Sequence, residues 1–137
     1  MSKITLQAFN QLIQAELPWA AENGITLESV DAGEAELHLP FQLRSLRPGG
    51  TIAGPHMMML DDACMYAVVL SQIGEVKLAV TTNLNINFLR KPVNSDLIAK
   101  GRMIKLGKRL AVVEVGIYSD TDIVAHATGT YSIPPGN

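Results

Sequence analysis

One apolar stretch decides the fold: residues 55–73, with the sequence PHMMMLDDACMYAVVLSQI. Pro55 suits the first turn of a helix, where no amide hydrogen is needed, and Gly74 marks a natural end. Apolar side chains occur nearly all round this predicted helix, so most of its sides must be buried. In a chain of 137 residues, only a curved sheet is available to wrap it.

The residues before this helix predict a smaller helix and two strands. Thr5 is a suitable N-cap, and apolar residues at helical spacing predict a helix over about 5–18, ending at Pro18. Strands are predicted at 25–30 and 34–39, joined by a tight turn. Residues 41–53 are predicted to be a loop.

The residues after the helix predict the rest of the sheet. Residues 77–90 alternate in polarity, which predicts one long strand. Its expected core face carries Leu78, Val80, Thr82, Leu84, Ile86 and Phe88. Three further alternating segments, separated by turns at 107–108 and 120–122, predict an antiparallel meander. The expected fold is α+β: residues 1–137 form a single domain in which a curved antiparallel sheet wraps a long central helix, with an extra N-terminal helix.

Composition excludes several classes of protein. The formal net charge of −2 argues against a nucleic-acid-binding module. The chain lacks about 18 consecutive uncharged apolar residues and an N-terminal secretion signal, so a cytoplasmic protein without a membrane span is expected. The single cysteine, Cys64, excludes an internal disulfide. The histidines, His38, His56 and His126, are too scattered to predict a metal site.

Several segments resemble a known family. The segments GGTIAG (49–54) and LDDA (60–63) are similar to the helix entry and catalytic helix of phenylacetate-degradation-type acyl-CoA thioesterases, which have the hot-dog fold. NINFLR (85–90) and LGKR (106–109) resemble that family's later strand and hairpin. The likeness extends over residues 25–132 and depends on the order and spacing of these pieces.

The resemblance implies a catalytic pair with one departure. The family carries His-Gly-Gly at the helix start and a carboxylate further along the helix. The alignment places Ala53, Gly54 and Pro55 on the triplet and Asp62 on the carboxylate, so the histidine and the second glycine are replaced. His56, three positions after Ala53, is the nearest substitute, although it also suits a first-turn residue without a chemical role.

These residue types suit thioester hydrolysis. A backbone amide at a helix N-terminus, such as that of Gly54, can bind a developing oxyanion. Asp62 can activate water or attack the carbonyl carbon directly, and the sequence does not choose between these roles. Thr81 aligns with a small hydroxyl residue that helps to position the attacking water in relatives, but it also fits an ordinary exposed strand position.

The spacing of the pair predicts an oligomer. Gly54 and Asp62 are eight residues apart, which is about 12 Å along a helix. One thioester cannot reach both, but two antiparallel copies of the helix across a two-fold axis would create two shared sites. We therefore expect a homodimer or homotetramer with sites between subunits.

Further residues are expected to bind the substrate. Asp61 has apolar neighbours one turn away and is a candidate partner for a cation across the interface, whereas Met58 and Met59 are candidates to line an acyl tunnel. Arg90, Lys91, Lys105, Lys108 and Arg109 form a candidate site for the phosphates of coenzyme A, the alternative being a solvated basic rim.

The leading hypothesis is an acyl-CoA hydrolase that needs no cofactor, since coenzyme A is part of its substrate. A non-catalytic acyl-thioester-binding protein of the same fold is the alternative. A hot-dog hydratase ranks last, because it would need an Asp and a His close together at the helix start.

Overall fold

The computed structural model describes residues 1–135. Its helices are α1 (Leu6–Glu16), α2 (Pro18–Ala21) and α3 (Gly54–Ile73), with a 3₁₀ turn at Leu43–Ser45. Its strands are β1 (Thr26–Asp31), β2 (Glu34–Leu39), β3 (Leu46–Arg47), β4 (Thr51–Ile52), β5 (Val80–Phe88), β6 (Leu97–Leu106), β7 (Leu110–Ser119) and β8 (Asp122–Ser132).

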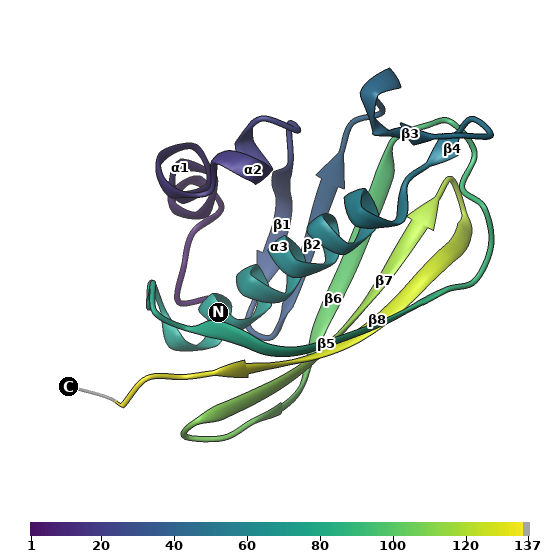
Figure 1. Cartoon of the computed structure of the whole chain (residues 1–137). Helices are drawn as coiled ribbons and strands as arrows, with labels where there is room; N and C mark the ends of the chain where they lie inside the picture. The colour runs from purple at the N-terminus through teal and green to yellow at the C-terminus, as the bar shows by residue number, and fades with distance from the viewer. Residues whose placement is uncertain (136–137) are drawn as a thin grey trace.

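The predicted hot-dog architecture is confirmed. Six antiparallel strands form one curved sheet in the order β1-β2-β6-β7-β8-β5, and α3 lies across its concave face (Figure 1). The helices α1 and α2 lie beside α3 near β1 (Figure 1). Within residues 1–135, no helix is both long and apolar enough to span a bilayer.

The central helix lies very close to the sheet because glycines occupy the points of closest approach. A Cβ atom on Gly101 of β6 would lie 2.8 Å from Cys64 Sγ and 2.9 Å from Val68 Cγ2. A Cβ atom on Gly129 of β8 would lie 2.5 Å from Met65 Sδ. These distances leave no room for a side chain, so the two glycines set how deeply α3 sits in the sheet.

Both ends of α1 have a clear physical cause. Thr5 is the N-cap, and its hydroxyl accepts a hydrogen bond of 3.0 Å from the Ala8 amide. The helix ends before Pro18, which then occupies the first position of the short helix α2. We predicted the end of α1 but not α2, because Pro18 marks a helix end and equally suits the start of a new helix.

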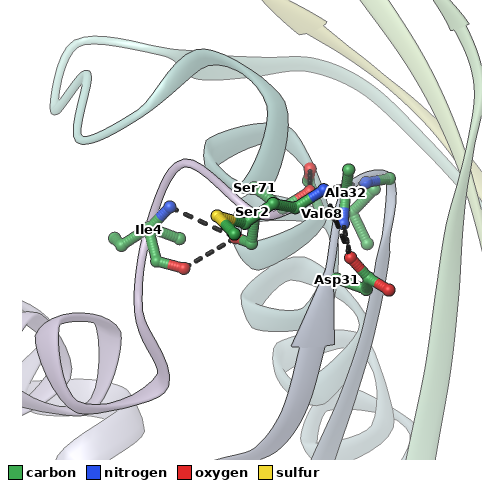
Figure 2. A network of polar contacts seen from close by, with 8 residues as sticks. Ser2, Ile4, Asp31, Ala32, Val68 and Ser71 are labelled. Carbon is green, nitrogen blue, oxygen red and sulfur yellow. Dashed lines mark hydrogen bonds and ion pairs between the residues drawn. The ribbon is translucent and has the colours of Figure 1, made fainter.

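Ser71 fixes the C-terminal part of α3 to the rest of the subunit. Its hydroxyl donates to the Val68 carbonyl (2.5 Å) and accepts from the Gly33 amide in the β1–β2 turn (2.9 Å). Its backbone carbonyl accepts from the Lys3 amide (2.7 Å). Figure 2 shows Ser71 between the N-terminal segment at Ser2 and the β1–β2 turn. The buried serine therefore joins three segments that are distant in the sequence.

The prediction of a loop over residues 41–53 was wrong in part. This segment contains the 3₁₀ turn and the small β3–β4 hairpin, in which Leu46 pairs with Ile52 and Arg47 with Thr51. Its turn has positive φ at Gly49 (99°) and Gly50 (80°). Strands of two residues are too short to show an alternating pattern, so no periodicity indicates them.

The predicted core face of residues 77–90 was also wrong in part. The strand β5 begins at Val80, and Leu78, Val80 and Phe88 are exposed. The register with β8 shifts between Thr81 and Asn83, so the alternation changes phase there. As a result, Thr81 is half-buried and faces α3, whereas Thr82 is exposed.

We expect Gly101→Ala to lower the free energy of unfolding by about 1–3 kcal/mol, because the new methyl group would overpack against α3. Urea denaturation would measure this loss. The additional change Cys64→Ala removes the nearest atom, so the double variant is expected to lose less stability than the sum of the two single variants. Additive losses would contradict the proposed crowding.

Candidate functional site

Asp62 lies at the centre of a polar cluster on α3. Its Oδ1 atom accepts hydrogen bonds from the hydroxyls of Thr81 (2.7 Å) and Tyr131 (2.9 Å). No described residue forms a hydrogen bond with its other carboxylate oxygen, Oδ2. Hydrogen bonds to a charged acceptor are stronger than neutral ones and fix the orientation of the carboxylate. One oxygen is therefore held by the protein, and the other remains available to a reactant.

Two neighbouring strands supply the hydroxyls. Thr81 on β5 and Tyr131 on β8 are register partners, and the bulge in β5 turns Thr81 toward the helix. Burial, followed by the charge of Asp62, raises the pKa of Tyr131, which keeps its hydroxyl protonated as a donor. Tyr131 is not among the site residues predicted from the sequence. The available signal was a tyrosine at the end of an alternating strand, since a buried tyrosine hydroxyl usually has a polar partner.

An aromatic stack connects this cluster with the N-terminal helix. The Tyr66 ring on α3 stacks on that of Tyr131, with centroids 6.2 Å apart and an interplanar angle of 17°. Phe9 of α1 lies on the other side, with its centroid 6.0 Å from that of Tyr66. Such pairs stabilise a fixed arrangement of rings. The position of Tyr131 therefore depends on α1 and α3 as well as on its own strand.

Two cavities meet at Asp62. The first, here called the tyrosine cavity, has a volume of about 240 Å³, and its walls include Leu17, Trp19, Tyr66, Lys77, Thr81 and Tyr131. The second, here called the methionine cavity, has a volume of about 410 Å³ and is lined by Trp19, Pro55, Met58, Met59, Leu84 and Asp62 itself. Asp62 and Trp19 border both, so a bound molecule could pass Asp62 with one part in each cavity.

Gly54 lies at the N-terminus of the same helix. It is the first residue of α3, and helix geometry leaves its amide without an acceptor inside the helix. A Cβ atom at this position would lie 3.1 Å from Phe88 Cζ, so the absence of a side chain allows the Phe88 ring to approach. Gly54 lines neither cavity, so one subunit does not bring its amide to Asp62.

Asp61 occupies a very different environment from Asp62. Its side chain is completely buried inside the subunit, and within residues 1–135 neither carboxyl oxygen has a hydrogen-bond partner. Burial, followed by repulsion from Asp62, raises its pKa from 3.8 to about 8. Asp61 borders neither cavity. We infer that it is a neutral core carboxyl near neutral pH.

The remaining predicted substrate-binding residues lie in three places. Met58 and Met59 line the methionine cavity. His56 is half-buried in the first turn of α3, and no residue within 1–135 bonds to its Nδ1 atom. Lys105, Lys108 and Arg109 lie in or next to the β6–β7 turn, whereas Arg90 and Lys91 follow the far end of β5.

The basic residues therefore form two groups within a subunit. Leu110 pairs with Ser132, which pairs with Val80, so the β6–β7 turn lies at the start of β5. Nine strand residues, about 30 Å, separate this turn from Arg90. Arg90 forms an ion pair with Asp122 at 3.2 Å. One subunit does not assemble the predicted cluster.

A third hollow, of about 470 Å³, lies on the outer face of the sheet. Both of its Lys and Arg side chains are paired with acidic residues of the same hollow: Arg102 with Glu114 at 2.6 Å and Lys100 with Glu36 at 3.9 Å. Among residues 1–135, no group of His, Cys, Asp and Glu side chains is suited to hold a metal ion. Asp62 is thus the best candidate for a reactive group.

We expect Asp61→Asn to stabilise the protein increasingly as the pH rises from about 4 to 8. Unfolding returns Asp61 to its ordinary pKa of 3.8 and releases its proton, so rising pH favours the unfolded wild type until the folded pKa near 8 is passed. The side-chain amide of the variant cannot titrate, and its gain in the free energy of unfolding at pH 8 should reach a few kcal/mol. Urea denaturation across this range measures it, with the exposed Asp31→Asn as the control. A gain independent of pH would contradict the assignment.

Comparison with known proteins agrees with this fold. The thioesterase superfamily model matches residues 49–126. A candidate esterase of Saccharolobus solfataricus is 33% identical over 112 residues, which cover 80% of this chain and 73% of the relative. The crystal structure of a candidate thioesterase from Silicibacter sp. TM1040 has 37% identity and a TM-score of 0.88, covering 98% of this chain and 95% of that one.

A further solved structure belongs to a relative of the phenylacetate-degradation type, which is the type that the sequence motifs resemble. A phenylacetic acid degradation-related candidate thioesterase from Ralstonia eutropha JMP134 has 25% identity and a TM-score of 0.81, covering 91% of this chain and 98% of that one. The matched region of the superfamily model contains α3, β5, β6, β7 and the first part of β8. The chain belongs to the thioesterase superfamily of hot-dog proteins.

Proposed function

We propose that this protein is an acyl-CoA thioesterase in which Asp62 activates the attack on the thioester. The main support is the Asp62 carboxylate, whose Oδ1 is held by Thr81 and Tyr131 while Oδ2 is unbonded by any described residue. It lies where the two cavities meet. A carboxylate with one fixed and one free oxygen suits proton transfer or nucleophilic attack.

Asp62 can promote thioester hydrolysis in either of two roles. As a general base, Asp62 takes a proton from water as the water oxygen attacks the carbonyl carbon, and the proton then passes to the departing coenzyme A sulfur. As a nucleophile, Oδ2 attacks directly, the C–S bond breaks and coenzyme A leaves as a thiolate that takes a proton from solvent; water then hydrolyses the resulting anhydride and restores the Asp62 carboxylate. Both routes form an oxyanion, for which a helix N-terminal amide is a suitable donor. Thr81 holds the carboxylate in place in either route.

The oxyanion donor is proposed to come from a second subunit. Met58 lies midway between Gly54 and Asp62 on α3, and Leu84 lies midway along β5. Both line the methionine cavity. A two-fold axis through this cavity and perpendicular to α3 and β5 would make both helices and both β5 strands antiparallel, bringing Gly54 of one subunit to Asp62 of the other. The strand β5 is at the sheet edge, with its outer side unpaired within residues 1–135.

The same axis would also unite the two basic groups. Antiparallel β5 strands place the end of one beside the start of the other. Arg90 and Lys91 of one subunit would then approach the partner's Lys108 and Arg109. Four positively charged side chains at one edge of the shared site suit the phosphates of coenzyme A. We therefore propose a dimer, or a tetramer built from such dimers, as the active form.

We expect Asp62→Asn to lower kcat about 10²–10⁴-fold on the acyl-CoAs that the wild type hydrolyses, because the amide cannot accept a proton or attack. Release of free thiol from a panel of acyl-CoAs measures this, with Asp31→Asn, an exposed aspartate far from the cavities, as the matched control. Equal rates would exclude Asp62 from the reaction. Tight acyl-CoA binding without turnover by the wild type would instead favour a binding protein.

We expect Met58→Asp to convert the dimer to a monomer of about 14.8 kDa and to abolish turnover, since it places two charges at the proposed axis. Sedimentation gives the mass, and circular dichroism tests whether the variant remains folded. Leu43→Asp, at a residue that is 78% exposed and borders neither cavity, is the control. An active, monomeric wild type would overturn the shared-site proposal.

A further inference from the structure

We propose that the tyrosine cavity is the acyl subsite and that Trp19 of α2 restricts it to compact acyl groups. This inference rests on the proposed thioesterase function and assigns a specificity-determining residue to it. Trp19 lies in the four-residue helix that the sequence pattern did not reveal, and it borders both cavities beside Asp62.

The choice of cavity follows from the proposed axis. Met58 and Leu84 line the methionine cavity at the point where a partner subunit would sit, so the partner would fill much of that space. The tyrosine cavity extends from Asp62 in the opposite direction, along α3 toward Tyr66. It is therefore the space that the dimer leaves open beside the reactive oxygen.

The walls of the tyrosine cavity define the size of its occupant. Its aromatic walls are Trp19, Tyr66 and Tyr131, of which the Tyr131 hydroxyl is already engaged by Asp62. Lys77 borders the cavity and forms an ion pair of 2.5 Å with Glu16 at the end of α1. This pair ties the N-terminal helices to the segment before β5 and limits the length of the cavity.

The volume also points to a small group. The cavity has a volume of about 240 Å³. Pockets that enclose drug-sized ligands have about 300–1,000 Å³. A short or compact acyl group fits within this volume with its carbonyl at Asp62, whereas a long fatty acyl chain would extend beyond the walls.

Trp19 is held in place by contacts of its own segment. Asn23 donates a hydrogen bond from Nδ2 to the Trp19 carbonyl (2.7 Å), and the same nitrogen lies 3.5 Å from Met59 Sδ on α3. The amides of Ala20 and Ala21 both bond to the Leu17 carbonyl. The short helix is thus fixed against α3, and the indole forms a wall rather than a mobile cover. Trp19 is 37% exposed, so shortening its side chain removes part of the cavity wall without opening the buried core.

The test compares kcat/KM for saturated acyl-CoAs from acetyl to palmitoyl in the wild type, Trp19→Ala and Trp19→Phe. We expect the wild type to prefer the short members. Trp19→Ala should raise the ratio of kcat/KM on long chains to kcat/KM on short chains at least tenfold, because each methylene that a hydrophobic pocket accepts or rejects changes kcat/KM by about tenfold or more. The ratio for Trp19→Phe should lie between those of the wild type and Trp19→Ala. Leu43→Ala, outside both cavities, should leave the ratio unchanged.

A second variant opens the cavity from its other end. Lys77→Ala removes an exposed side chain and the ion pair to Glu16, so it should fold and also increase activity on longer chains. A wild type that turns over palmitoyl-CoA as well as short acyl-CoAs, or an unchanged ratio in both Trp19→Ala and Lys77→Ala, would overturn this inference alone. No turnover of any acyl-CoA by the wild type would instead overturn the proposed function.

Discussion

The burial of α3 against the curved sheet is the constraint on which the rest of the structure depends. A helix that is apolar nearly all round is stable in water only when most of its surface is covered. The sheet covers one side, with Gly101 and Gly129 allowing close approach, and α1 and α2 lie beside it. The exposed Met58 lines an open cavity on the remaining side. The same need for burial that forms the fold thus favours a second subunit.

Helix geometry explains why two adjacent aspartates differ so strongly. Successive residues on a helix point about 100° apart, so Asp61 and Asp62 cannot share an environment on a helix this deeply buried. Asp61 points into the core, where an unpaired charge is costly, and its pKa rises to about 8. Asp62 points to the gap between α2 and β5 and receives two hydroxyl donors. A hydrogen-bonded carboxylate beside two cavities and a neutral buried carboxyl therefore follow from a single step along the chain.

The edge strand β5 contributes to the site in two ways. Its bulge turns Thr81 toward Asp62, and its unpaired outer side offers backbone groups to another strand. The first effect completes the polar cluster within a subunit. The second supports the proposed dimer, in which Gly54 and Asp62, at opposite ends of a helical segment, would belong to one site. In that dimer, the same strand would contribute to both catalysis and association.

The sequence by itself determined the central helix, its ends, the antiparallel meander and the superfamily, and it indicated Asp62 as the residue now proposed to be the reactive group. These depend on local periodicity, on Pro55 and Gly74, and on short motifs, all of which can be read along the chain. The tertiary structure alone decided that Tyr131 binds Asp62, that Trp19 borders both cavities and that Asp61 is buried. Tyr131 and Asp62 are 69 positions apart, and their contact depends on strand register and on the bulge at Thr81. A periodic pattern specifies which face of an element is buried, but it contains no information on which distant residue lies opposite.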